Sequence, residues 1–270
     1  MRAAHRQTRV WVEEIMGIPM SVQLISAGER DEATTERAVR ACFDELHEID
    51  RVFSTYRPDS DINRIRRGEV ALADADPRVG VAAAACERAE QATGGLFSGH
   101  WQGWFDPTGW VKGWAVEEAS RRHLAPLLSS ALAVGINAGG DLQLFTAPGA
   151  DWRWHVGIAD PHERGRMIAT LDIADGAVAT SGTAERGLHI LDPRTGEPAT
   201  GVASATIVAD GLAQADVWAT AAVVAGRTDH SWIGPSATRT GIVVDDDGAV
   251  TRWLGSTVID VCEVSGSQAA

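Results

Sequence analysis

One lysine, Lys112, stands among the 24 lysine and arginine residues of this 270-residue chain. It follows the turn sequence Asp106-Pro107-Thr108-Gly109 and lies near the start of a predicted helix. The free N–H groups at a helix N-terminus favour phosphate, and lysine adds a compact charge on a flexible stem. This stretch therefore predicts a phosphate site, with a lysine on a solvated loop as the alternative.

A carboxylate and a hydroxyl are four residues apart in the sequence, at Asp216 and Thr220. On the helix predicted for residues 213–226, this spacing places both oxygens on one face. Both are hard ligands that suit magnesium, which needs about six oxygens and takes several from water and phosphate. The alternative is an acidic residue near a helix N-terminus, where the helix dipole favours it.

Three other sites in the sequence each give only a weak indication of function when considered alone. Asp106 could bind a ligand or stabilise its own turn. Gly139-Gly140 before Asp141 suits a tight turn or a bulge. His189 lies in a short apolar run, where a structural histidine is the alternative to a general base.

Composition limits the classes of function. The hydrophobic share of 44% can build a sizeable core, and the net charge of −13 argues against non-specific binding to nucleic acid or anionic membranes. Three widely spaced cysteines suggest neither a zinc site nor a disulfide framework. No signal peptide, lipid-anchor cysteine or transmembrane run is recognised, so we expect a cytoplasmic protein without membrane insertion.

The hydrophobic pattern predicts an α+β fold. A strand is expected over residues 10–26 with an interruption at 17–19, and helices over 31–53, 78–93 and about 113–128. After Ser130 the chain reads as short strands with one more helix at 213–226 and a hairpin around an Asp-Gly turn at 240–254. No G-x-G-x-x-G, Walker A, G-x-S-x-G or H-E-x-x-H motif supports the common dehydrogenase, kinase, hydrolase or zinc-protease classes.

The order of several segments resembles the FAD:protein FMN transferase family, also called ApbE-like. The segments are STYRPDSDINRI, DPTGWVKGWAVEEA, INAGGDLQLF, ATSG, HILDPRTGEP and ADVWATAAVV, and the resemblance covers roughly residues 15–226. It implies a T-fold-like architecture with mixed or antiparallel sheets flanked by helices. One domain is expected over 10–262, alternatively divided into a helix-rich part (10–130) and a strand-rich part (131–262), followed by a flexible tail (263–270).

The resemblance also implies an activity. Members bind FAD and a divalent cation, usually magnesium, and move FMN onto a serine or threonine of an acceptor flavoprotein with release of AMP. Two alternatives remain open: an FAD pyrophosphatase that yields FMN and AMP, and an FAD-binding protein without turnover. Ser98 and Ala219 favour the last alternative, because many members have aspartate at both positions.

Residue by residue, the resemblance assigns three groups of positions. Lys112, Asp216 and His189 are the expected catalytic residues, with His189 as general base. The metal ligands are the Gly109 backbone oxygen, Asp216 and Thr220. The expected FAD contacts are Met16, Tyr56, Leu96, Phe97, Ser98, Asp106, Lys112 and Leu191.

Overall fold

A computed structural model describes residues 6–28, 31–183 and 189–259 of the chain. In this part of the chain, one sheet of nine strands runs in the order β1-β2-β3-β4-β7-β8-β9-β10-β11, and β5 and β6 pair separately. The strands are β1 (Gln7–Ile15), β2 (Ile18–Ser26), β3 (Ala133–Ala138), β4 (Asp141–Thr146), β5 (Trp154–Ala159), β6 (Met167–Ile173), β7 (Gly176–Gly182), β8 (Val202–Ala209), β9 (Thr240–Asp245), β10 (Val250–Leu254) and β11 (Thr257–Ile259). Neighbouring strands are antiparallel, which confirms the predicted α+β class.

The expected interruption at residues 17–19 is a two-residue hairpin turn. Ile15 pairs with Ile18, and Met16 and Gly17 have φ angles of 56° and 71°. Two successive positive φ angles define the type I′ turn that best matches the twist of antiparallel strands. The chain therefore reverses direction at this turn, and β2 runs back from Ile18 alongside β1.

Helix starts follow recognisable capping residues. Asp31 accepts a hydrogen bond from the N–H of Thr34, and Asp76 does the same for Arg78 ahead of Pro77. These caps agree with the predicted beginnings of two helices. The helices are α1 (Glu32–Phe53), α2 (Asp61–Arg66), α3 (Pro77–Ala92), α4 (Thr108–Ala119), α5 (Leu212–Ala225) and α6 (Ile233–Ser236).

Helix α4 begins earlier than predicted. The Asp106–Gly109 sequence reads as a turn, but Thr108 and Gly109 already form the first turn of α4, so Lys112 lies in its second turn. Beyond Ala119 the chain continues as a wider turn over Ser120–Leu124 and a tighter one over Ala125–Ser129. Pro126 lacks the N–H that a regular helix would require there.

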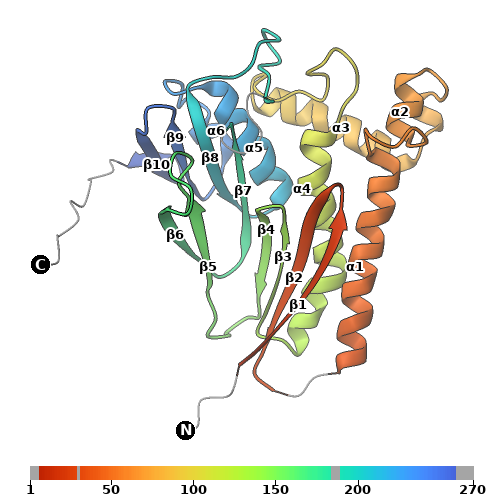
Figure 1. Ribbon diagram of the computed structural model, residues 1–270, viewed down its shortest axis with the longest axis vertical. Coiled ribbons are helices and arrows are strands. Elements are labelled where there is room, and N and C mark those ends of the chain that lie inside the picture. Colours follow the sequence, from red (N-terminus) through yellow and green to blue (C-terminus); the bar gives the residue numbers. More distant parts are fainter. Residues whose placement is uncertain (1–5, 29–30, 184–188, 260–270) are drawn as a thin grey trace, which may run out of the picture.

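Helices cover one face of the large sheet (Figure 1). Helix α5 packs on β7 and β8 and against α4, and α4 packs against α1. Leu144 and Val178 point to the opposite face, where they contact Trp154 of β5 and Ile173 of β6. Adjacent residues of one strand thus enter different cores, as the alternation of side chains requires.

The helix-side core joins both halves of the chain. It extends in sequence from Ile15 to Trp253, and β1 and β2 from the N-terminal half belong to the same sheet as the later strands. The boundary considered near residue 130 therefore runs through one sheet and one core. The tail at 263–270 lies outside the described residues.

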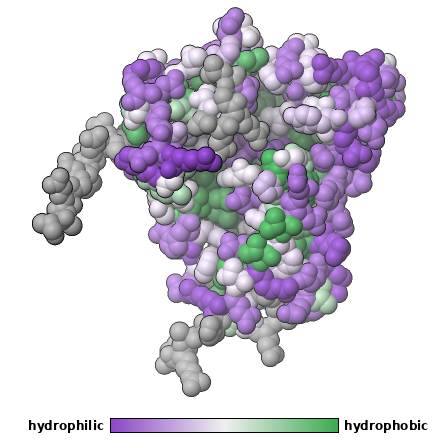
Figure 2. Space-filling view, viewed as in Figure 1, coloured by the Kyte–Doolittle hydropathy of each residue, from purple (hydrophilic) through white to green (hydrophobic). Residues whose placement is uncertain are grey.

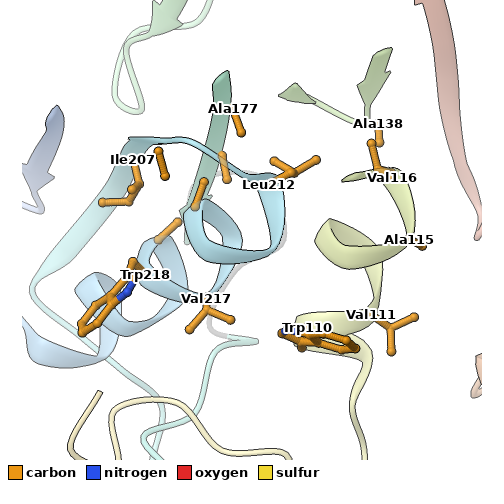
Figure 3. Close-up of a cluster of buried hydrophobic side chains, with 14 of the residues drawn as sticks. Trp110, Val111, Ala115, Val116, Ala138, Ala177, Ile207, Leu212, Val217 and Trp218 are labelled. Carbon is orange, nitrogen blue, oxygen red and sulfur yellow. The ribbon is translucent and has the colours of Figure 1, made fainter. Parts of the chain in front are cut away.

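Figure 3 shows the part of this core that lies between α4 and α5. Val116 of α4 and Leu212 of α5 extend toward each other, and both are buried. The outer surface differs: the face in Figure 2 is mostly hydrophilic, with limited hydrophobic areas. Within the described residues, no helix has the length and apolar character needed to cross a membrane.

Candidate active site

Helices α4 and α5 make close contact at Gly113. A β-carbon on this residue would lie 2.8 Å from the carbonyl oxygen of Leu212 and 3.0 Å from Cβ of Asp216. Such distances are too short for carbon, so a larger residue would push the two helices apart. Glycine at this position therefore lets the preceding residue, Lys112, reach the side chains of α5.

The ammonium of Lys112 is held between two acidic side chains. Nζ forms an ion pair and a hydrogen bond with Oδ2 of Asp141, and it lies 3.3 Å from Oδ2 of Asp216. The carboxylates are buried, with 4% and 7% of the side chain exposed, whereas Lys112 keeps 30% exposed. The lysine thus has two fixed counter-charges beneath it and an open side toward solvent.

Asp141 is the first residue of β4 and is itself oriented by β7. Its Oδ1 accepts a hydrogen bond of 2.9 Å from the N–H of Thr180. Gly139 and Gly140, with φ angles of 63° and 105°, form the tight turn before it. Asp141 is a site residue that the sequence did not assign, because the glycine pair before it gave only a weak turn signal.

The charges in this cluster depend on one another. Burial works against the charged form of Lys112, but the charges of Asp216 and Asp141 outweigh it and raise the pKa of the lysine above its usual value. Burial raises the pKa of Asp216 to about 6, since the attraction of Lys112 only partly offsets burial and the repulsion from Asp141. The protonated, charged form of Lys112 is therefore favoured. The charged form of Asp216 is disfavoured by burial and is stabilised by a positive group beside it.

Oxygen donors gather beside Asp216. Its Oδ2 is buried and accepts no hydrogen bond from the described residues. One turn later along α5, Oγ1 of Thr220 lies 3.3 Å from Oγ of Ser181 on β7. A buried carboxylate oxygen without a hydrogen bond, one helical turn from a threonine hydroxyl, fits a hard cation such as magnesium.

Acidic side chains do not complete such a site by themselves. Residues 6–28, 31–183 and 189–259 contain no cluster of three or more histidine, cysteine, aspartate or glutamate side chains placed to hold a metal. A cation next to Asp216 would need hydroxyl, backbone, water or substrate oxygens as further ligands. This composition is usual for magnesium, which keeps several waters and takes substrate phosphate.

Comparison with known proteins decides the family. The model of the ApbE family matches residues 16–103 and 102–237. This chain belongs to the ApbE family. The match includes the hairpin tip at Met16, all of α4 and all of α5, and so it contains every residue of the cluster described above.

Individual ApbE proteins show how far the likeness extends. A FAD:protein FMN transferase of Rhodobacter capsulatus is 37% identical over 125 residues, which are 43% of this chain and 24% of that protein. The aligned part thus spans about a quarter of the relative's length. The fold is close to the ApbE protein of Thermotoga maritima (TM-score 0.77, 23% identity, 91% of this chain and 97% of that one) and to flavin transferase ApbE of Vibrio cholerae (0.70, 19%, 93% and 98%). These structures confirm the predicted ApbE-like architecture.

The three expected metal-ligand positions lie on α4 and α5. Gly109 is in the first turn of α4, three residues before Lys112, and it is exposed. Asp216 and Thr220 are one turn apart on α5, as the spacing predicted. Ala219 is fully buried, and its methyl side chain offers no oxygen to a cation.

The expected FAD contacts have different environments. Met16 is half-buried at the hairpin tip, and Tyr56 is 95% exposed in the loop after α1. Leu96 and Phe97 are buried in the helix-side core. Ser98 donates a hydrogen bond of 2.9 Å to Glu90 Oε2. Met16 and Tyr56 therefore have side-chain surface available to a ligand, while Leu96 and Phe97 have little.

The side chain of Asp106 stabilises its own turn, which was one of the two possibilities in the sequence. Its Oδ1 accepts hydrogen bonds from the N–H of Thr108 at 3.0 Å and from the Thr108 hydroxyl at 2.6 Å. The side chain thus stabilises the start of α4, where no other side chain acts as a cap. Contact with FAD remains a prediction for this residue.

His189 and Leu191 lie in the loop before β8. His189 is exposed and follows residues 184–188, which lie outside the described part of the chain. Leu191 pairs with Pro198 as an isolated bridge rather than within the strand expected here. Both assignments remain predictions of the family resemblance.

Proposed function

We propose that this ApbE protein transfers the FMN half of FAD to a serine or threonine of an acceptor protein and releases AMP. The observation that supports this proposal is the ammonium of Lys112, fixed by Asp141 and 3.3 Å from Oδ2 of Asp216, a buried oxygen whose only ion-pair partner among the described residues is this lysine. One cation faces solvent, and oxygens for a second cation lie beside it. This arrangement suits a diphosphate, whose charge must be neutralised during transfer. The name of the relative from Rhodobacter capsulatus describes the transfer of FMN from FAD to a protein.

Asp216, Thr220 and the backbone oxygen of Gly109 are the groups that would hold magnesium. When bound, magnesium would neutralise phosphate oxygens and the charge on the departing AMP. Asp216 has the appropriate character, because burial alone disfavours its charge and a divalent cation would restore it. Ser181, whose hydroxyl lies 3.3 Å from that of Thr220, can orient the threonine oxygen.

The remaining steps belong to the side chains of this protein. Lys112 would bind the diphosphate and stabilise its charge as the bond between the two phosphates breaks. The acceptor hydroxyl oxygen forms the new bond to the FMN phosphorus, and its proton passes to His189. AMP leaves with the electron pair of the broken phosphorus–oxygen bond. A general base of this kind contributes about 10²–10⁴-fold to the rate.

The flavin would lie toward the hairpin tip and the loop after α1. Tyr56 has a fully accessible ring that can stack on the isoalloxazine, and Met16 offers an apolar contact. Leu96, Phe97, Ser98, Asp106 and Leu191 complete the proposed FAD contacts. A cytoplasmic acceptor protein remains a prediction of the sequence.

Intact-mass measurement tests the reaction. Purified protein is mixed with FAD, MgCl₂ and a candidate acceptor, with EDTA in a parallel sample. We expect FMN bound covalently to the acceptor, AMP in solution, and neither product with EDTA. Release of FMN and AMP without labelling of any acceptor would indicate the pyrophosphatase, and intact FAD in every sample would indicate a binding protein.

A further inference from the structure

The first turn of α5 is capped by side chains from two other elements. Gly211, the N-cap residue, makes no side-chain cap hydrogen bond. The N–H of Leu212 donates instead to Oε1 of Gln143 at 3.0 Å, and the N–H of Ala213 donates to Oε2 of Glu117 at 3.0 Å. Free N–H groups in a first helical turn need such acceptors.

Gln143 lies on β4, two residues after Asp141, so both side chains point to the helix face of the sheet. It is 1% exposed, and its Nε2 donates to the carbonyl oxygen of Gly176 at 3.2 Å. Both ends of the amide are therefore bonded. Strand β4 thus holds Lys112 through Asp141 and the start of α5 through Gln143.

Glu117 lies on α4, five residues after Lys112. Its carboxylate is partly buried and forms an ion pair of 3.0 Å with Arg121. A β-carbon on Gly211 would lie 2.4 Å from Oε2 of Glu117, so only glycine leaves room for this approach. A carboxylate at a helix N-terminus is also favoured by the helix dipole.

We infer that Gln143 and Glu117 are positioning residues, which set the height and rotation of α5 so that Asp216 and Thr220 face Lys112. The two elements that carry Asp141 and Lys112 also carry the two caps, so one frame fixes both halves of the site. This inference rests on the proposed function, because it assigns a cation to Asp216 and Thr220. Loss of a cap would let the first turn of α5 shift and weaken cation binding.

The test uses Mn²⁺ as the probe, since carboxylate and hydroxyl sites that suit magnesium also take manganese. Mn²⁺ affinity is measured by electron paramagnetic resonance on the full chain without FAD. We expect Glu117→Ala to bind about 10-fold more weakly than wild type, as is usual when a group that orients metal ligands is lost. Glu117→Gln should bind within about 3-fold of wild type, because its amide oxygen can still accept from Ala213.

Glu118→Ala is the matched control. Glu118 is the next residue on α4, its side chain is 43% exposed, and it pairs with Arg122 at 3.7 Å. It should bind Mn²⁺ like wild type. Equal weakening in Glu117→Gln and Glu117→Ala, or in Glu118→Ala, would indicate a general charge effect and overturn the positioning role.

Gln143→Leu removes the second cap without any change of charge, and circular dichroism shows whether this variant folds. We expect weaker Mn²⁺ binding than wild type, and the Glu117 series decides the matter if this variant does not fold. Wild-type affinity in Glu117→Ala would overturn the positioning inference while leaving the proposed function intact. Absence of Mn²⁺ binding to wild type would overturn the cation site of the proposed function together with the inference.

Discussion

Lys112 on α4 and Asp216 on α5 face each other across the Gly113 contact, with Nζ 3.3 Å from Oδ2. The lysine ammonium also pairs with Asp141, so the negative charge below it exceeds its own. A second cation is therefore electrostatically favoured beside Asp216, and a bound divalent cation would make the cluster net positive, which favours an anion on the open side of Lys112. The same cluster can thus recruit both a metal ion and a phosphate.

Replacement of Asp216 should remove the metal dependence of the reaction. We expect Asp216→Ala to lose at least about 100-fold in FMN transfer at saturating MgCl₂, because the site loses its charged ligand. Gln214→Ala on the same helix, whose side chain donates to the carbonyl oxygen of Ser236, serves as the control. Magnesium titrations of both variants give the answer, and unchanged activity in Asp216→Ala would refute the metal assignment.

Replacement of Lys112 should affect both turnover and stability. Lys112→Met should lose most turnover, and it should lower the free energy of unfolding by about 3 kcal/mol, because two buried carboxylates lose their counter-charge. MgCl₂ should restore part of this stability by binding at Asp216. Urea unfolding with and without MgCl₂ measures the effect, and Arg166→Met, at an exposed ion pair, is the control. Full activity in Lys112→Met would make the single lysine a coincidence.

The helix contact at Gly113 should not tolerate a methyl group. Gly113→Ala should destabilise the protein by about 1–3 kcal/mol, because the nearest neighbours are two backbone atoms of α5 and Cβ of Asp216, which cannot move unless the helix moves. Gly80→Ala in α3 has open space around the new methyl and should stabilise by about 0.5–1 kcal/mol. Thermal unfolding of the pair compares them. Equal melting temperatures would show that α4 and α5 are not closely packed at this point.

Two cysteines should be inert in the folded protein. Burial raises the pKa of Cys42 and of Cys86 to about 12, so at pH 8 both remain protonated and the reactive thiolate is rare. Because these folded-state pKa values are raised, the thiolate becomes accessible only at much higher pH or after unfolding. Iodoacetamide labelling followed by peptide mass spectrometry should modify both residues in guanidinium but not in buffer. Equal labelling in the two conditions would contradict their burial.

Much of the fold could be predicted because its signals are local. The apolar spacing of Val39, Phe43 and Leu46, with acidic residues at the start of the segment, located α1 to within one residue. The Asp-Gly turn located the β9–β10 hairpin in the same way. The early start of α4 was missed because Thr108 and Gly109 have turn chemistry, which tertiary packing overrides here. The β5–β6 hairpin stands apart from the large sheet and packs on Val178 and Val208, which are more distant in sequence, so no local pattern shows this arrangement.

The site could be predicted only in part for the same reason. Asp216 and Thr220 share a helix, so their spacing was informative. Asp141 depends on Lys112, which is contributed by another element, and Glu117 and Gln143 act on backbone groups of α5. Such partners leave no pattern in a single sequence. Within the described residues, the environment of His189 likewise follows from a loop and not from a periodic element.

Strand β4 carries its polar residues Asp141 and Gln143 on one face and its leucines Leu142 and Leu144 on the other. A slip of this strand by a single residue would exchange the two faces, placing both polar groups in the apolar layer beside Trp154. Gain or loss of one residue in the Gly139–Gly140 turn would therefore damage folding and chemistry together. We therefore expect proteins that share this site to differ in this turn by substitutions and not by insertions or deletions. The length of the turn would then identify the site as well as its residues do.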